Sequence, residues 1–166
     1  LYIAAGRSYE ELRSTLTDLR RSPGEHYEIS TKYWELLTES LPKEKLVRQS
    51  IAVLIGHIGA NGEIPASMDT DILKFNLDTY AYIWPRDAVH VATALDAMGF
   101  WSFTRRFYQK LFNEMLTSEG YLFQKYNADS TFGSTWHPWT ANTRQSRNIQ
   151  EDETALAIYG LSLIHI

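Results

Sequence analysis

Apolar residues recur at helical spacing along most of the chain and predict six helices. In the third of these, Ile51, Leu54 and Ile58 lie three or four positions apart and so share one face. Ser8 followed by Glu11 is typical of a capping box at a helix start. The predicted helices span residues 8–21, 26–41, 43–59, 87–98, 101–117 and 149 onward.

The connections between the predicted helices alternate between long and short. Residues 60–86 and 118–148 form two long connections, whereas almost nothing separates the fourth helix from the fifth. Because each long connection leads into an apolar helix, we expect both at the same end of a set of stacked helical hairpins. Long connections in a compact domain are often functional. The pattern therefore predicts an all-α fold with its functional residues at that end.

Composition narrows the classes of function. The chain has 166 residues, of which 44% are hydrophobic and 22% charged, as in globular domains. A net charge of −4 argues against nucleic acid or an anionic membrane as the partner, and no apolar run is long enough to span a bilayer. The absence of cysteine and of any HExxH, EF-hand or glycine-rich phosphate motif predicts no metal or other cofactor. The sequence does not indicate a cellular compartment.

The segment YAYIWPRDAV (80–89) places a charged pair, Arg86 and Asp87, at the edge of an apolar stretch. One interpretation is that Asp87 caps the following helix or complements its dipole. The other is that the pair binds a sugar. Hydroxyl groups need both a donor and an acceptor, and the aromatic rings of Tyr82 and Trp84 suit the C–H face of a sugar ring.

The segment NIQEDET (148–154) carries three consecutive carboxylates where the last helix begins. Asn148 and Glu151 have capping-box spacing. Glu153 shares a stripe with Ile149 and Leu156, and a carboxyl on an apolar stripe has a raised pKa, as a general acid requires. Upstream, two tryptophans in STWHPW (134–139) suit either a core or a sugar platform. These two residues are Trp136 and Trp139.

Taken together and in this order, these three segments resemble the bacterial and archaeal branch of glycoside hydrolase family 15, which includes glucoamylases, glucodextranases and some trehalases. The resemblance covers roughly residues 44–160, and GEIPAS (62–67) is also similar. It implies an (α/α)₆ barrel with the active site at the N-terminal ends of the inner helices. It also implies inverting hydrolysis of α-glucosides from the non-reducing end, with two carboxyls ~6.5–9.5 Å apart.

The resemblance assigns roles to individual residues. Glu153 matches the general acid of a QxDE motif, and Arg86 and Asp87 match a pair that grips the hydroxyls of the terminal glucose. Trp84 would line that pocket, while Trp136 and Trp139 match more loosely as contacts near the leaving sugar. The implied partner is an oligosaccharide or polysaccharide.

The resemblance also predicts the domain organisation. Residues 1–42 are expected to be the end of an upstream β-sandwich domain and a helical linker, and residues 43–166 the N-terminal part of the barrel. The general base of this family lies in the second half of the barrel, so the chain alone is expected to be inactive. The alternatives are a trehalase or glucodextranase of the same family, or a non-catalytic helical domain of this type with a regulatory or a carbohydrate-binding role.

Overall fold

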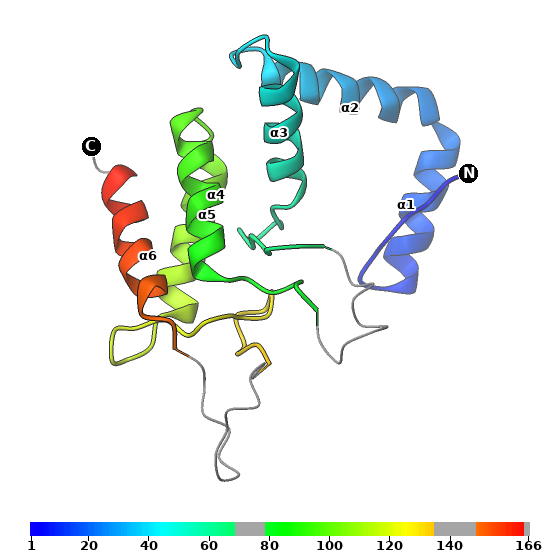
Figure 1. The fold of residues 1–166 in the computed structure, drawn as a ribbon. Coiled ribbons are helices and arrows are strands. Elements are labelled where there is room, and N and C mark those ends of the chain that lie inside the picture. The colour runs from blue at the N-terminus through cyan, green and yellow to red at the C-terminus, as the bar shows by residue number, and fades with distance from the viewer. Residues whose placement is uncertain (69–78, 135–148, 165–166) are drawn as a thin grey trace. The chain divides into compact units, whose positions relative to one another are not determined.

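The computed structural model describes residues 1–68, 79–134 and 149–164. These residues form six α-helices and one π-helix, and no strand occurs among them apart from isolated bridges. The all-α prediction is therefore confirmed. The helices are α1 (Tyr9–Arg21), α2 (Pro23–Thr38), α3 (Lys45–Gly56), α4 (Pro85–Ala97), α5 (Trp101–Lys110), the π-helix η2 (Leu111–Met115) and α6 (Glu151–Ile164) (Figure 1).

Residues 1–48 form one compact unit that contains α1 and α2. The predicted start of α1 is confirmed, because the Ser8 hydroxyl accepts a hydrogen bond from the backbone N–H of Glu11 at 3.2 Å. The second helix begins at Pro23, earlier than predicted, since proline fits the first position of a helix. Residues 1–8, where the end of a β-sandwich strand was expected, form neither helix nor strand. Neither helix contains a buried residue.

Residues 49–166 form the second unit, whose core lies between α4, α5 and α6. α4 packs against both α5 and α6, and a three-residue turn joins α4 to α5 as a hairpin (Figure 1). The core is rich in aliphatic and aromatic side chains. It consists of Ile64, Ile83, Ala88, Val89, Ala92, Phe107, Tyr108, Leu111, Met115, Leu122, Phe123, Tyr126 and Ala157.

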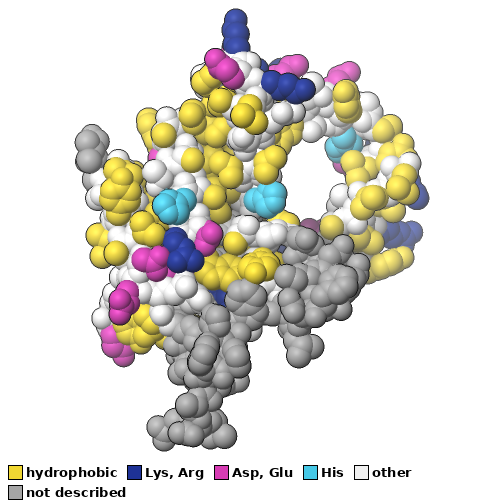
Figure 2. Space-filling view, in the orientation of Figure 1, with side chains coloured by type: hydrophobic (Ala, Val, Ile, Leu, Met, Phe, Trp, Pro, Cys, Tyr) yellow, Lys and Arg dark blue, Asp and Glu magenta, His cyan; other side chains and the backbone are white. Residues whose placement is uncertain are grey.

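The sixth helix has one buried stripe, formed by Glu153, Ala157 and Gly160. Its other apolar residues are more accessible, and Ile158 and Tyr159 are 61% and 56% exposed. Figure 2 shows hydrophobic side chains at the surface over this helix. The described residues therefore cover only one face of this largely apolar helix. No helix in the described part of the chain is long and apolar enough to span a bilayer.

The helix predicted over 101–117 changes geometry partway. α5 ends at Lys110, and the next turn is a π-helix in which the backbone N–H of Leu116 reaches back to the carbonyl of Leu111 at 3.0 Å. Leu111 and Met115 are both buried. The carbonyl of Met115 then accepts a hydrogen bond from the fully buried Tyr126 hydroxyl at 2.9 Å, which fixes the following loop to this turn.

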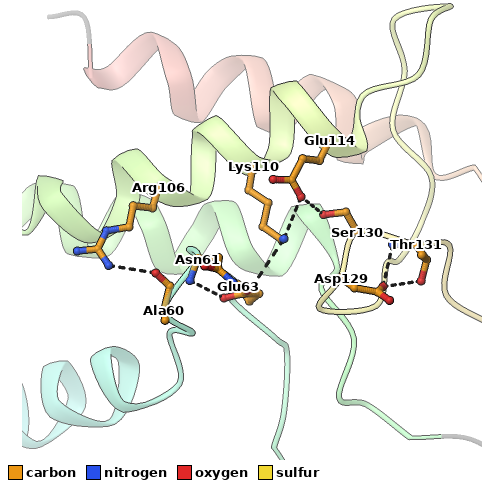
Figure 3. Close-up of polar contacts among 9 residues, drawn as sticks. All are labelled: Ala60, Asn61, Glu63, Arg106, Lys110, Glu114, Asp129, Ser130 and Thr131. Atoms are coloured by element: carbon orange, nitrogen blue, oxygen red, sulfur yellow. Dashed lines mark hydrogen bonds and ion pairs between the residues drawn. The ribbon is translucent and has the colours of Figure 1, made fainter. Parts of the chain in front are cut away.

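Charged side chains fasten the connecting segments to α5 and η2 (Figure 3). Lys110 is 7% exposed, and its Nζ lies 3.0 Å from a Glu114 oxygen and 3.8 Å from a Glu63 oxygen. The same Glu114 oxygen accepts a hydrogen bond from the Ser130 hydroxyl at 2.5 Å. We call Glu63, Lys110, Glu114 and Ser130 the Lys110 cluster. It holds the loop before residue 64 and the turn at 127–131 against one helix.

Gly62 allows the first of these loops to approach α5 closely. Its φ is +87°, and a Cβ there would lie 2.5 Å from the backbone of Arg106 and Phe107. Glycine is therefore needed at this point for two reasons, conformation and space. The same loop continues through Ile64, which is buried in the core, so the GEIPAS segment has a structural role in the described residues.

Candidate active site

The N-terminal ends of α4 and α6 meet, although 66 residues separate them in sequence. Arg86 Nη1 donates a hydrogen bond to Asp152 Oδ2 at 2.9 Å. The backbone N–H of Arg86 also donates to Glu153 Oε2. The prediction that both long connections end at the same end of the helices is therefore confirmed. We call Arg86, Asp87, Asp152 and Glu153 the Arg86 cluster.

Local sequence explains why these side chains lie in first turns. Trp84 is the N-cap of α4 and Pro85 its first residue, which places Arg86 and Asp87 at the next two positions. No side chain caps this helix, so the interpretation of Asp87 as its N-cap is wrong, whereas a favourable interaction with the helix dipole remains. α6 likewise opens with Glu151, Asp152 and Glu153. The predicted capping partner Asn148 lies outside the described residues.

Glu153 is fully enclosed, with 0% of its surface exposed. Burial raises the pKa of its carboxyl from 4.5 to about 8, against the opposing effects of the Arg86 N–H and the Arg86 charge. Its Oε1 has no hydrogen-bond partner among the described residues. The group is therefore protonated at neutral pH, as sequence reasoning predicted for this stripe, but it does not reach the surface in this conformation.

Arg86 and Asp87 are two neighbouring accessible members of the cluster. Their side chains are 37% and 50% exposed, and Arg86 Nε lies 4.0 Å from Asp87 Oδ2. The hydrogen bond that Arg86 donates to Asp152 is the largest of the effects that raise the pKa of Arg86, so the guanidinium stays charged. Among the described residues, Arg86 Nη2 has no protein acceptor. Donors and acceptors with spare capacity therefore lie side by side, as binding of a hydroxyl group requires.

Trp84 lies behind this pair and is only 6% exposed. Its ring packs against Tyr80 at 5.8 Å and against Tyr82 at 5.7 Å between centroids. The ammonium group of Lys125 lies 5.3 Å from the Trp84 ring centroid and 4.6 Å from that of Tyr82. Most of the ring surface is thus already covered, which leaves little of Trp84 for contact with a ligand.

Sequence reasoning missed two contributors to this region. Lys125 is 3% exposed and covers aromatic rings, but a lone lysine in the GYLFQKYN segment gives no signal of burial. Asp152 was treated only as a neighbour of Glu153, yet it is the residue that binds the Arg86 side chain. The remaining predicted contacts, Trp136 and Trp139, lie outside the described residues, so their positions are not assigned.

The cluster fits proton transfer and hydroxyl binding better than metal binding. Within residues 1–68, 79–134 and 149–164, no three histidine, aspartate or glutamate side chains are grouped so that they could hold a metal ion. Arg86 supplies a positive charge at the centre of the cluster, which opposes a cation there.

Comparisons with models of protein families, with curated proteins and with solved structures gave no match for this chain.

Proposed function

We propose that this chain is part of an inverting, exo-acting hydrolase of α-glucosidic bonds, of the glucoamylase type, with an (α/α)₆ architecture. The observation that supports it best is the meeting of the WPRD segment with the QEDE segment through Arg86, Asp152 and Glu153. The family resemblance requires these two motifs at one site, and nothing in their separation along the chain forces them together. The ligand is then the non-reducing end of a starch-type oligosaccharide.

In this proposal Arg86 and Asp87 hold hydroxyls of the terminal glucose. The half-exposed guanidinium donates to sugar oxygens, and the half-exposed carboxylate accepts from hydroxyl hydrogens. Neither role requires the charged groups to leave their present positions, because each retains bonding capacity. The compact hydroxyl array of a pyranose suits such a neighbouring donor and acceptor.

Glu153 is the proposed proton donor to the leaving oxygen. Its pKa of about 8 keeps the proton available at neutral pH. Because the side chain is fully enclosed, the proposal requires the Glu153 carboxyl to leave the Arg86 N–H and turn toward the sugar when it binds, while Arg86 and Asp87 stay in place. The second carboxyl, which activates water, is expected in the other half of the barrel.

Enclosure of Glu153 also favours a second candidate, a non-catalytic domain that binds carbohydrate. In that case the buried carboxyl anchors α6 to α4 by accepting the Arg86 N–H, and only the exposed pair contacts sugar. Both candidates share the sugar-binding role of Arg86 and Asp87. They differ in whether Glu153 ever exchanges a proton with a ligand.

Calorimetric titration of the 166-residue chain with maltose tests the shared part. We expect Arg86→Ala to weaken binding at least about tenfold, because it removes the charged donor. Arg105→Ala is the matched control, since Arg105 is an exposed arginine of α5 away from the cluster, and it should bind as the wild type does. Equal affinities for all three proteins, or no binding by the wild type, would contradict the proposal.

Glucose release from maltotriose separates the two candidates. The 166-residue chain should bind but not hydrolyse, because the expected base is missing. In a longer polypeptide that supplies the base, Glu153→Gln should abolish release of β-glucose and retain maltose binding. If hydrolysis survives this substitution, Glu153 is not the proton donor. It would then serve only to anchor α6 to α4, and another residue would donate the proton.

A further inference from the structure

Arg86 belongs to α4 and is held to α6 by two hydrogen bonds. Its backbone N–H donates to Glu153, and its guanidinium donates to Asp152, both of which belong to the first turn of α6. Asp87, its neighbour on α4, lies farther away at 4.0 Å. Of the three carboxylates, Asp152 is therefore the one whose side chain fixes the guanidinium.

The stability gained from this ion pair is small. The Arg86 and Asp152 side chains are 37% and 51% exposed, and exposed ion pairs contribute little to folding. The contact does, however, restrict a long side chain with several rotatable bonds. A guanidinium that is already ordered loses less conformational entropy when a ligand binds, and this increases affinity.

The charge of Asp152 also affects which ligands are favoured. Asp87 and Asp152 are exposed carboxylates on either side of one arginine. A neutral hydroxyl can share the guanidinium with them, whereas a phosphate group would be repelled by them and would compete with Asp152 for the same donors. The arrangement therefore favours neutral sugars over phosphorylated ones.

We propose that Asp152 is a positioning residue that orients Arg86 for neutral sugars and disfavours phosphorylated sugars at the same place. This inference rests on the proposed sugar-binding role of Arg86 and extends it to the selection of the ligand. Asp152 acts through Arg86 and is not assigned a contact with the sugar. Its removal should change selectivity, which a purely structural contact would leave unchanged.

The test compares Asp152→Asn and Asp152→Ala with the matched control Glu151→Gln. Glu151 is also exposed and acidic in the first turn of α6, but it makes no contact with Arg86 in the described residues. We expect maltose affinity to fall about threefold in Asp152→Asn, which keeps an acceptor oxygen, and about tenfold in Asp152→Ala. The ratio of glucose 1-phosphate affinity to maltose affinity should rise in both. Glu151→Gln should leave maltose affinity unchanged.

A second measurement does not depend on sugar binding. The ¹⁵N heteronuclear NOE of Arg86 Nε–H reports the order of the side chain, and it should fall in both Asp152 variants and stay unchanged in Glu151→Gln. If the wild type binds neither sugar but this signal changes as expected, the proposed function fails and the positioning contact stands. Unchanged order of Arg86, or an unchanged affinity ratio in variants that bind maltose, overturns the inference. Thermal unfolding checks that every variant is folded.

Discussion

The Arg86 cluster and the Lys110 cluster both join segments that are far apart in sequence, and they differ in how completely their charges are paired. In the Lys110 cluster, the buried ammonium has two carboxylates within 4.0 Å, and one of these also accepts a hydrogen bond from Ser130. In the Arg86 cluster, Glu153 Oε1 is buried without a partner in the described residues, and Asp87 has only a distant ion pair.

The two clusters also differ in how they accommodate a buried ionisable side chain. The buried Lys110 side chain lies beside two carboxylates, whereas Glu153 becomes neutral because burial raises its pKa. A fully paired cluster mainly holds structure together, while unused donors and acceptors are available to a ligand. The comparison therefore predicts that substitutions will affect stability in one cluster and binding in the other, with Glu153 as the exception that affects both.

The largest expected effect is the pH dependence caused by Glu153. Its folded pKa, about 8, exceeds its ordinary value of 4.5, so the folded state binds more protons between these limits. Its contribution to stability is fully present below pH 4.5 and is lost as the pH rises through 8. We expect the free energy of unfolding to fall by roughly 4–5 kcal/mol across this window.

Urea unfolding at a series of pH values measures this dependence. Glu153→Gln is the control, because the amide stays neutral and can still accept the N–H of Arg86. Subtracting its profile from that of the wild type removes the contributions of other titrating groups. A flat difference between pH 5 and 8 would show that the carboxyl is not enclosed in solution.

The next largest effect concerns Lys110→Met. This change keeps the length and apolar stem of the side chain but leaves Glu63, whose side chain is 13% exposed, without its cation. We expect a loss of about 2 kcal/mol in the free energy of unfolding, below the usual cost of breaking a buried pair because Glu114 is half exposed. Arg105→Met on the exposed side of α5 should cost far less, and maltose affinity should be unaffected by either change.

A smaller effect is expected where α6 packs against its neighbours. A Cβ on Gly160 would lie 2.5 Å from the Tyr108 hydroxyl and 2.7 Å from Val89 Cγ1, so Gly160→Ala should cost about 1 kcal/mol. Gly56→Ala is the control, since nothing lies within 4 Å of that position. Chemical denaturation measures both. Equal stability of the two variants would contradict the close packing of α6 against Val89 of α4 and Tyr108 of α5.

Hydrophobic periodicity and helix-breaking residues predicted most of the helices. The helix predicted over 87–98 corresponds to α4, which begins at Pro85 and buries Val89, Ala92 and Leu95 along one face. The meeting of α4 and α6 was predicted from the long connections alone. The π-helix at 111–115 was not, because its hydrogen bonds depend on how Leu111 and Met115 fit the core, and their spacing also suits an ordinary helix.

The candidate site was predictable in its residue types and less so in its contacts. Sequence indicated that Arg86, Asp87 and Glu153 belong together, but a run of three acidic residues does not reveal which one faces an arginine 66 positions away. Burial of Lys110 and Lys125 was also hidden, since charged side chains are buried only where tertiary partners compensate them, and those partners come from separate segments.

The smallest effects give the most direct comparison of the two clusters. Asp87 and Glu114 are both 50% exposed and both paired with a cation, so Asp87→Asn and Glu114→Gln should each lower the free energy of unfolding by only about 0.5 kcal/mol. Their effects on maltose affinity should differ, with a severalfold loss for Asp87→Asn and none for Glu114→Gln. Calorimetric titration of the two variants measures this. Similar affinities of the two variants would mean that the position beside Arg86 does not make Asp87 a sugar-binding carboxylate, and the comparison of the clusters would fail.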